Sequence, residues 1–170
     1  MKRWLLIILL ATPSPLFAQN NKFDGFVMNA PAFRKIQSFC VDTHNLPDDQ
    51  VKVVEHFVEQ ESKPKGLLTK LPWHRLATCQ DAGVDALVRL EFPHDSPFAR
   101  PQRNDVQSVL LVFKPGSPSP IYETPAVTIP GRPRHDEDDD PFDVKLIADL
   151  LEYSAASSVV RILIHDWQKL

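Results

Sequence analysis

The chain has few of the residue patterns that mark a catalytic site. It contains only five glycines among 170 residues, and they form neither a glycine-rich phosphate loop nor the GxSxG turn that presents a serine nucleophile. Its six histidines show neither the HxH nor the HExxH spacing of zinc sites. These absences argue against a recognisable enzyme, and the sequence predicts no cofactor.

Apolar runs long enough to cross a bilayer are also missing, but a short one near the N-terminus predicts an export signal. Lys2 and Arg3 precede eight apolar residues, Trp4–Ala11, and prolines and a small residue lead up to Ala18. A spanning helix needs about 20 residues, so we expect cleavage after Ala18 rather than an uncleaved anchor. Gln19 stands where a lipoprotein would carry cysteine. The mature chain is therefore expected to be periplasmic or secreted, with no membrane span.

Positive charge is scarce in the mature chain. Removing residues 1–18 leaves 152 residues with 17 basic and 22 acidic side chains, a net charge of about −5. Proteins that bind nucleic acid or anionic membranes concentrate positive charge on one face. The balance therefore argues against both kinds of partner.

Cysteine occurs only twice, at positions 40 and 79. The spacing excludes a CxxC redox motif, and an exported chain meets an oxidising compartment, which favours a Cys40–Cys79 disulfide. Two separate buried thiols, or a catalytic thiol, are the alternatives.

The remaining pattern predicts one α+β domain. We expect a signal peptide over 1–18, a flexible leader over 19–32 and a single domain over 33–170. The domain has the order β-α-β-β-β-α, with a four-stranded mixed sheet and two main helices on one face. The predicted strands cover 34–42, 84–92, 106–113 and 121–129, and the predicted helices cover 47–62 and 141–167.

Two of these elements carry features of their own. Pro125 cannot donate to a β-ladder, so its strand is expected at an edge or a bulge. The last helix is expected to be continuous, although the sequence SAASS at 154–158 is a possible break. Its predicted apolar side consists of Phe142, Leu146, Ile147, Leu150 and Leu151.

Ten of the 16 prolines fall between Pro93 and Pro141, eight of them in three loops over 93–105, 114–120 and 130–140. Loops of this kind carry binding residues, although proline also stiffens exposed loops without any partner. The candidate ligand or partner contacts are aromatic, histidine and arginine side chains in the 93–105 loop and in the LPWHRL stretch: Trp73, His74, His94, Phe98 and Arg100. Alternatively, the tryptophan of LPWHRL anchors its loop on the core.

An acidic run, DEDDD, suggests a calcium site formed by Asp136, Asp138 and Asp140. The EF-hand pattern fails, because its glycine position holds Pro141 and its bidentate glutamate position holds Ile147. A looser site remains open beside the simpler alternative, in which the acids cap the N-terminus of the last helix.

The order of elements over residues 33–167 resembles small bacterial envelope domains. A short strand RKIQSFCVD, a crossover helix and the phrase DAGVDALVRLEF before the next strand are similar to DUF4136-like lipoproteins and to TolB N-terminal or curli-secretion CsgG-type modules. The chain departs from them by lacking the lipidation cysteine. The resemblance implies a fold and an envelope location, and it carries no catalytic motif.

Three functions remain open from the sequence. The first is a non-enzymatic envelope module that binds another protein or serves as a scaffold. The second is a small periplasmic hydrolase or ligand-binding enzyme, with a site assembled from His74, His94, Arg100 and the acidic run. The third is a calcium-stabilised structural domain.

Overall fold

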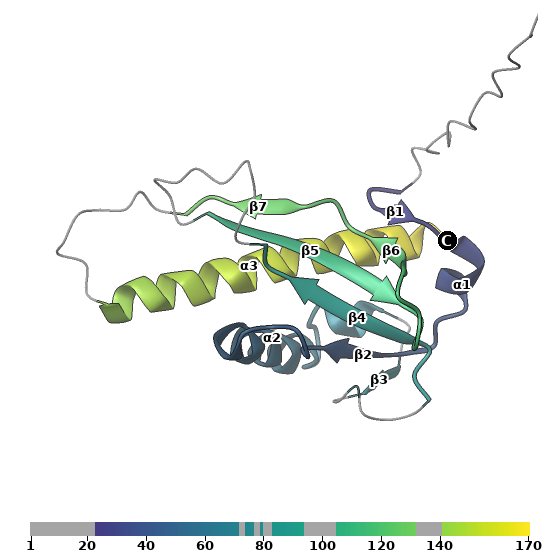
Figure 1. Cartoon of the computed structure of the whole chain (residues 1–170), viewed down its shortest axis with the longest axis horizontal. Helices are drawn as coiled ribbons and strands as arrows, with labels where there is room; N and C mark the ends of the chain where they lie inside the picture. The colour runs from purple at the N-terminus through teal and green to yellow at the C-terminus, as the bar shows by residue number, and fades with distance from the viewer. Residues whose placement is uncertain (1–22, 72–73, 77–78, 80–82, 94–104, 132–140) are drawn as a thin grey trace, which may run out of the picture.

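The computed structural model describes residues 23–71, 74–76, 79, 83–93, 105–131 and 141–170. Within them the chain forms a single α+β domain, in which a mixed sheet is packed against helices α2 (Asp48–Glu61) and α3 (Pro141–Gln168) (Figure 1). The predicted fold class is confirmed. The predicted signal peptide, residues 1–18, lies outside the described residues.

The sheet has more strands than the sequence predicted. Six strands follow the order β1-β6-β5-β4-β2-β3, and β7 pairs with β5 outside this path. Strand β2 runs parallel to β3 and β4, and the other pairings are antiparallel. The bounds are β1 Phe26–Val27, β2 Ser38–Asp42, β3 His74–Leu76, β4 Ala86–Glu91, β5 Val106–Phe113, β6 Pro120–Glu123 and β7 Val127–Ile129.

The predicted number of four strands is therefore wrong, for two physical reasons. Strands β1 and β3 have only two and three residues, too few to show a period of two in the sequence. The predicted strand over 121–129 is also divided. Leu111 pairs with Glu123 but Ser108 pairs with Val127, so the stretch around Pro125 holds one extra residue. This is the bulge that its missing N–H predicted.

The segment expected as a flexible leader, 19–32, contributes structure where it is described. It supplies β1 and most of helix α1 (Ala30–Arg34), which begins after the Asn29 side chain accepts a hydrogen bond from the Ala32 amide. Both elements are too short for hydrophobic periodicity to reveal them.

Helices α2 and α3 end close to the predicted positions. Helix α2 stops before Ser62, and Pro64 and Gly66 follow it; a short 3₁₀ helix, η1 (Leu68–Lys70), leads towards β3. Helix α3 is continuous through 154–158, as predicted. The Ser154 and Ser158 hydroxyls each donate to the carbonyl four residues earlier, which satisfies them within the helix.

The core lies between the two helices and one face of the sheet. Alternate residues of β4 are buried on that face, whereas Leu87, Arg89 and Glu91 on the other face are partly exposed. Figure 1 shows α3 running behind β5. One apolar cluster joins both helices to β4, so they cover the same face, as predicted: it includes Val54, Phe57, Ala86, Val88, Leu90, Ala155, Val159 and Leu163.

The predicted disulfide is present and lies on the opposite side of the sheet. Cys40 pairs in register with Leu87, which places it on the face away from the helices. Its partner Cys79 follows β3, with the two Cα atoms 5.2 Å apart. The bond thereby fastens the connection between β3 and β4 onto β2, the strand that lies between them in the sheet.

Candidate functional site

Most of the site residues predicted from sequence lie outside the described residues. This applies to Trp73, His94, Phe98 and Arg100 of the contact site, and to the calcium candidates Asp136, Asp138 and Asp140. His74 is the first residue of β3 and pairs in register with Ser38. Both sites therefore stay predictions.

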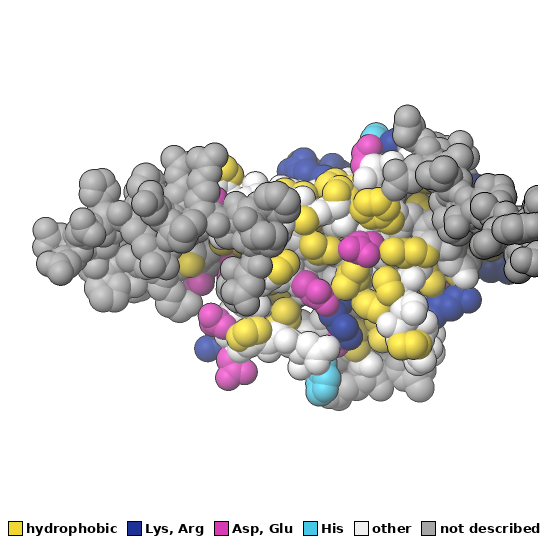
Figure 2. Space-filling view, turned by 45° about the horizontal axis from the view of Figure 1, so that its top comes forward, with side chains coloured by type: hydrophobic (Ala, Val, Ile, Leu, Met, Phe, Trp, Pro, Cys, Tyr) yellow, Lys and Arg dark blue, Asp and Glu magenta, His cyan; other side chains and the backbone are white. Residues whose placement is uncertain are grey.

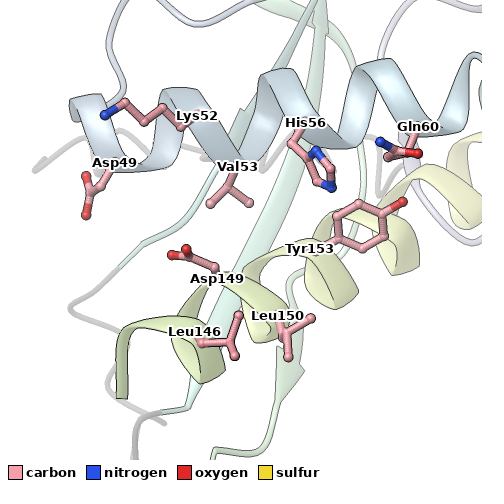
Figure 3. Close-up of a pocket in the computed structure, with 9 residues that line it drawn as sticks. All are labelled: Asp49, Lys52, Val53, His56, Gln60, Leu146, Asp149, Leu150 and Tyr153. Carbon is pink, nitrogen blue, oxygen red and sulfur yellow. The ribbon is translucent and has the colours of Figure 1, made fainter. Parts of the chain in front are cut away.

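Helices α2 and α3 enclose a groove between them with a volume of about 660 Å³. Five lining residues come from α2 and four from α3, and each helix contributes them at intervals of one, three or four residues, so they form one face (Figure 3). The lining consists of Asp49, Lys52, Val53, His56, Gln60, Leu146, Asp149, Leu150 and Tyr153.

One side of the groove exposes apolar surface. Leu146 and Leu150, one helical turn apart on α3, are 47% and 59% exposed, and only two other large hydrophobic residues in the described ranges are comparably exposed. Val53 of α2, 8% exposed, lines the same groove. Single exposed leucines are common, but an adjacent pair lining a groove is typical of an interaction surface.

These two leucines correct a sequence expectation. Both belong to the predicted apolar side of the last helix, which would normally face the core. In this part of α3 the apolar residues cover a wider part of the helix surface than the core can bury. The sequence pattern therefore did not show which of them lie outside the core. That excess was the one sequence signal for the groove.

Tyr153 and Glu61 close the other end of the groove. The Tyr153 hydroxyl donates to Glu61 Oε1 at 2.7 Å, while Glu61 Oε2 accepts the Leu67 amide at 2.7 Å. The Tyr153 ring also meets Phe57 edge-on, with centroids 5.2 Å apart, and lies 6.1 Å from the His56 ring. These contacts bind α2, α3 and the turn after α2 to one another.

The same contacts fix the protonation of both groups. The Leu67 amide, with help from the Tyr153 hydroxyl, holds the pKa of Glu61 below its ordinary value despite partial burial. Burial, followed by the hydrogen bond to Glu61, raises the pKa of Tyr153 to about 12. A carboxylate that stays charged and a phenol that stays protonated form a structural pair near neutral pH rather than an acid and base poised for proton transfer.

Acidic side chains dominate the two helical segments that frame the groove. Residues 48–61 and 146–153 contain one basic residue, Lys52, and no arginine. Their seven acidic residues are Asp48, Asp49, Glu55, Glu59, Glu61, Asp149 and Glu152. Two of these seven, Asp49 and Asp149, line the groove beside Lys52, so its lining combines exposed apolar surface with a small excess of negative charge.

A cluster of side chains that could hold a metal ion lies at the end of α3. Ligand atoms of Asp24, His165 and Asp166 lie within 4.8 Å of one another. The fully buried Asp166 carboxylate already accepts hydrogen bonds from the Asp24 amide at 2.7 Å, the Gly25 amide at 2.6 Å and the Tyr122 hydroxyl at 2.9 Å. This saturation explains Asp166 as an anchor for the N-terminal segment.

The face of the sheet away from the helices carries a mixed surface. Arg89 Nη2 lies 2.7 Å from Asp42 Oδ2, and the guanidinium stands 5.0 Å from the Phe113 ring centre. Burial opposes ionisation of Asp42, but its contact with Arg89 and the His44 amide outweigh that effect and lower its pKa. Figure 2 shows hydrophobic patches broken by acidic and basic side chains. The Arg89–Asp42 pair thus interrupts the apolar surface of this face.

Within the described ranges, no helix has the length and hydropathy needed to cross a membrane.

Comparisons with known proteins do not place this chain in a family. No protein family, no curated protein and no solved structure matches the chain. The resemblance to envelope domains therefore stays a prediction from the order of elements.

Proposed function

We propose that this chain is an exported, non-enzymatic module that binds another protein of the cell envelope through the groove between α2 and α3. The observation that carries this proposal is the exposure of Leu146 and Leu150 along that groove. Burying apolar area stabilises an interface by about 25 cal/mol per Å², so two leucines one turn apart favour association. The fold itself does not bury them.

The chemistry of the lining supports binding over catalysis. His56 is its single histidine, and the Glu61–Tyr153 pair beside it is fixed in charge. The lining combines three aliphatic side chains and one tyrosine with five polar or charged side chains, and such a mixture of apolar and polar groups is typical of recognition sites. The Cys40–Cys79 disulfide supports the exported location, because such bonds persist in oxidising compartments.

Site-specific photo-crosslinking in the native host tests this proposal. A photoreactive residue replaces Leu150 in the full-length chain, and a matched control carries it at Lys114, which is exposed in the turn after β5. We expect a protein adduct from position 150 and none from position 114. The yield of this adduct should fall when Leu146→Asp is added, because the change places a charge on the apolar surface of the groove. The fold should tolerate the change, because Leu146 is 47% exposed. Equal adducts at both positions, or none at 150, would contradict the proposal.

The expected export is checked on the same cells. Intact mass of the mature protein should correspond to a chain that begins at Gln19, in the periplasmic or extracellular fraction. A full-length mass from the cytoplasm would contradict it.

A further inference from the structure

We infer that the partner enters this groove as an amphipathic helix with basic side chains along its edges. The inference rests on the proposed function, since it names the chemistry of the partner at the same site. Three properties of the groove lead to it: the nature of its walls, its length and its charge.

The walls favour a helix over an extended chain. Both are α-helices, whose backbone N–H and C=O groups are bonded within each helix. An extended peptide gains affinity by pairing with the free edge of a sheet, and neither helix presents such an edge. A partner that satisfies its own backbone hydrogen bonds is therefore required, and a helix does so.

The length suits a short helix. Asp49 and Gln60 mark the two ends of the lining on α2, and eleven residues of helix extend about 16 Å. That distance corresponds to about three turns of a third helix. Apolar side chains at spacings of three and four residues on the partner would meet Val53, Leu146 and Leu150.

The charge of the groove favours basic side chains along the edges of the partner helix. The charged side chains that line the groove are Asp49, Asp149 and Lys52, and the framing segments add five more acidic residues, so the groove repels anionic groups and attracts cations. Lysine or arginine beside the apolar stripe would lie near Asp49 and Asp149, which line opposite walls (Figure 3). An anionic amphiphile such as a fatty acid would meet the same repulsion, which makes it the less favoured occupant.

Titration of the isotope-labelled mature protein with two synthetic peptides tests the inference. Both peptides have the same leucine stripe over about four helical turns, and one carries lysine where the other carries glutamate. We expect the lysine peptide to bind more tightly by about five-fold or more, with NMR shift changes confined to 48–61 and 146–153. Equal or tighter binding of the glutamate peptide, or of a fatty acid, would overturn the inference.

Two charge variants and one apolar variant assign the interaction to the groove. Asp49→Asn should weaken binding of the lysine peptide by about two- to five-fold. The matched control Glu55→Gln removes the same charge from an exposed position of α2 that does not line the groove, so its effect should be smaller. Leu150→Asp should abolish binding. Equal effects of the Asp49 and Glu55 variants would contradict contact in the groove.

The outcomes also separate this inference from the proposed function. Protein capture at position 150 without binding of the lysine peptide would mean a partner of different chemistry, so the inference would fail while the proposed function stands. Absence of both capture and peptide binding would contradict both.

Discussion

Tyr153 of α3 donates its phenolic hydrogen to Glu61 of α2, with Oη and Oε1 2.7 Å apart. This bond joins the two helices at one end of their groove, while Leu146 and Leu150 remain exposed along the rest of it. The fold thus holds the two walls of the groove together at one end and leaves apolar surface exposed between them.

Loss of the Tyr153 hydroxyl should weaken this closure. Tyr153→Phe keeps the ring that packs on Phe57 but leaves Glu61 without one of its two donors. We expect the free energy of unfolding to fall by about 1–2 kcal/mol, measured by urea denaturation. Ser154→Ala, at an exposed neighbouring position, is the control with an expected change within about 0.5 kcal/mol. Equal effects of the two variants would contradict a specific role for the bond.

Both tyrosines of the chain should resist ionisation. Burial and Glu61 raise the pKa of Tyr153 to about 12, while burial and the Asp166 charge raise that of Tyr122 further. A raised pKa means that the folded state binds the phenolic proton more tightly than the unfolded state does. The stabilisation linked to Tyr153 is therefore fully present below about pH 10 and is lost as the pH rises from 10 to about 12. Near-ultraviolet absorbance should show no tyrosinate near pH 10 in the folded protein. A one-tyrosine step there would contradict the burial of these groups.

The disulfide should contribute strongly to stability. It closes a loop with a sequence separation of 39 residues, for which the chain-entropy model gives about 4 kcal/mol. Replacing Cys40 and Cys79 with alanine together should lower the free energy of unfolding by about 2–4 kcal/mol. Alkylation of two thiols in the unfolded, unreduced wild-type protein would show that the bond is absent in solution.

Asp166 should anchor the N-terminal segment on α3. Asp166→Asn retains the size of the side chain but loses an acceptor for at least one of its three donors, at a cost of about 1.5–3 kcal/mol. The Asp24 and Gly25 amides should exchange hydrogen faster. Gly25→Ala should have a similar effect, because a Cβ there would lie 2.5 Å from the Tyr122 hydroxyl oxygen. Unchanged exchange in both variants would contradict the anchor.

Long periodic segments were predictable from sequence, because their patterns reflect local geometry. The strand Val106–Phe113 has the predicted bounds, and the helix Asp48–Glu61 lies within its predicted range. Prediction of the disulfide needed only the composition and the export signal. The missing N–H of Pro125 predicted an edge or a bulge, but not the division of that strand into β6 and β7.

Features that depend on distant parts of the chain were not predictable in the same way. Strand β3 consists of three residues that are held by pairing with β2. Asp166 accepts hydrogen bonds from two backbone amides that are 141 and 142 residues away in the sequence. The groove was missed because the apolar pattern of the last helix does not say which leucines the core leaves uncovered. Only the packing of α2 against α3 decides that.

Stability and partner capture, measured in one variant, show whether Leu146 and Leu150 serve binding or the fold. In Leu146→Ser/Leu150→Ser, we expect the free energy of unfolding to stay within about 1 kcal/mol of wild type, because both side chains are half-exposed. Protein capture by a photoreactive residue at the exposed groove position Lys52 should be lost in the same variant. A loss of stability above about 3 kcal/mol would mean that the leucines serve the fold. Unchanged capture would mean that the groove is not the binding site.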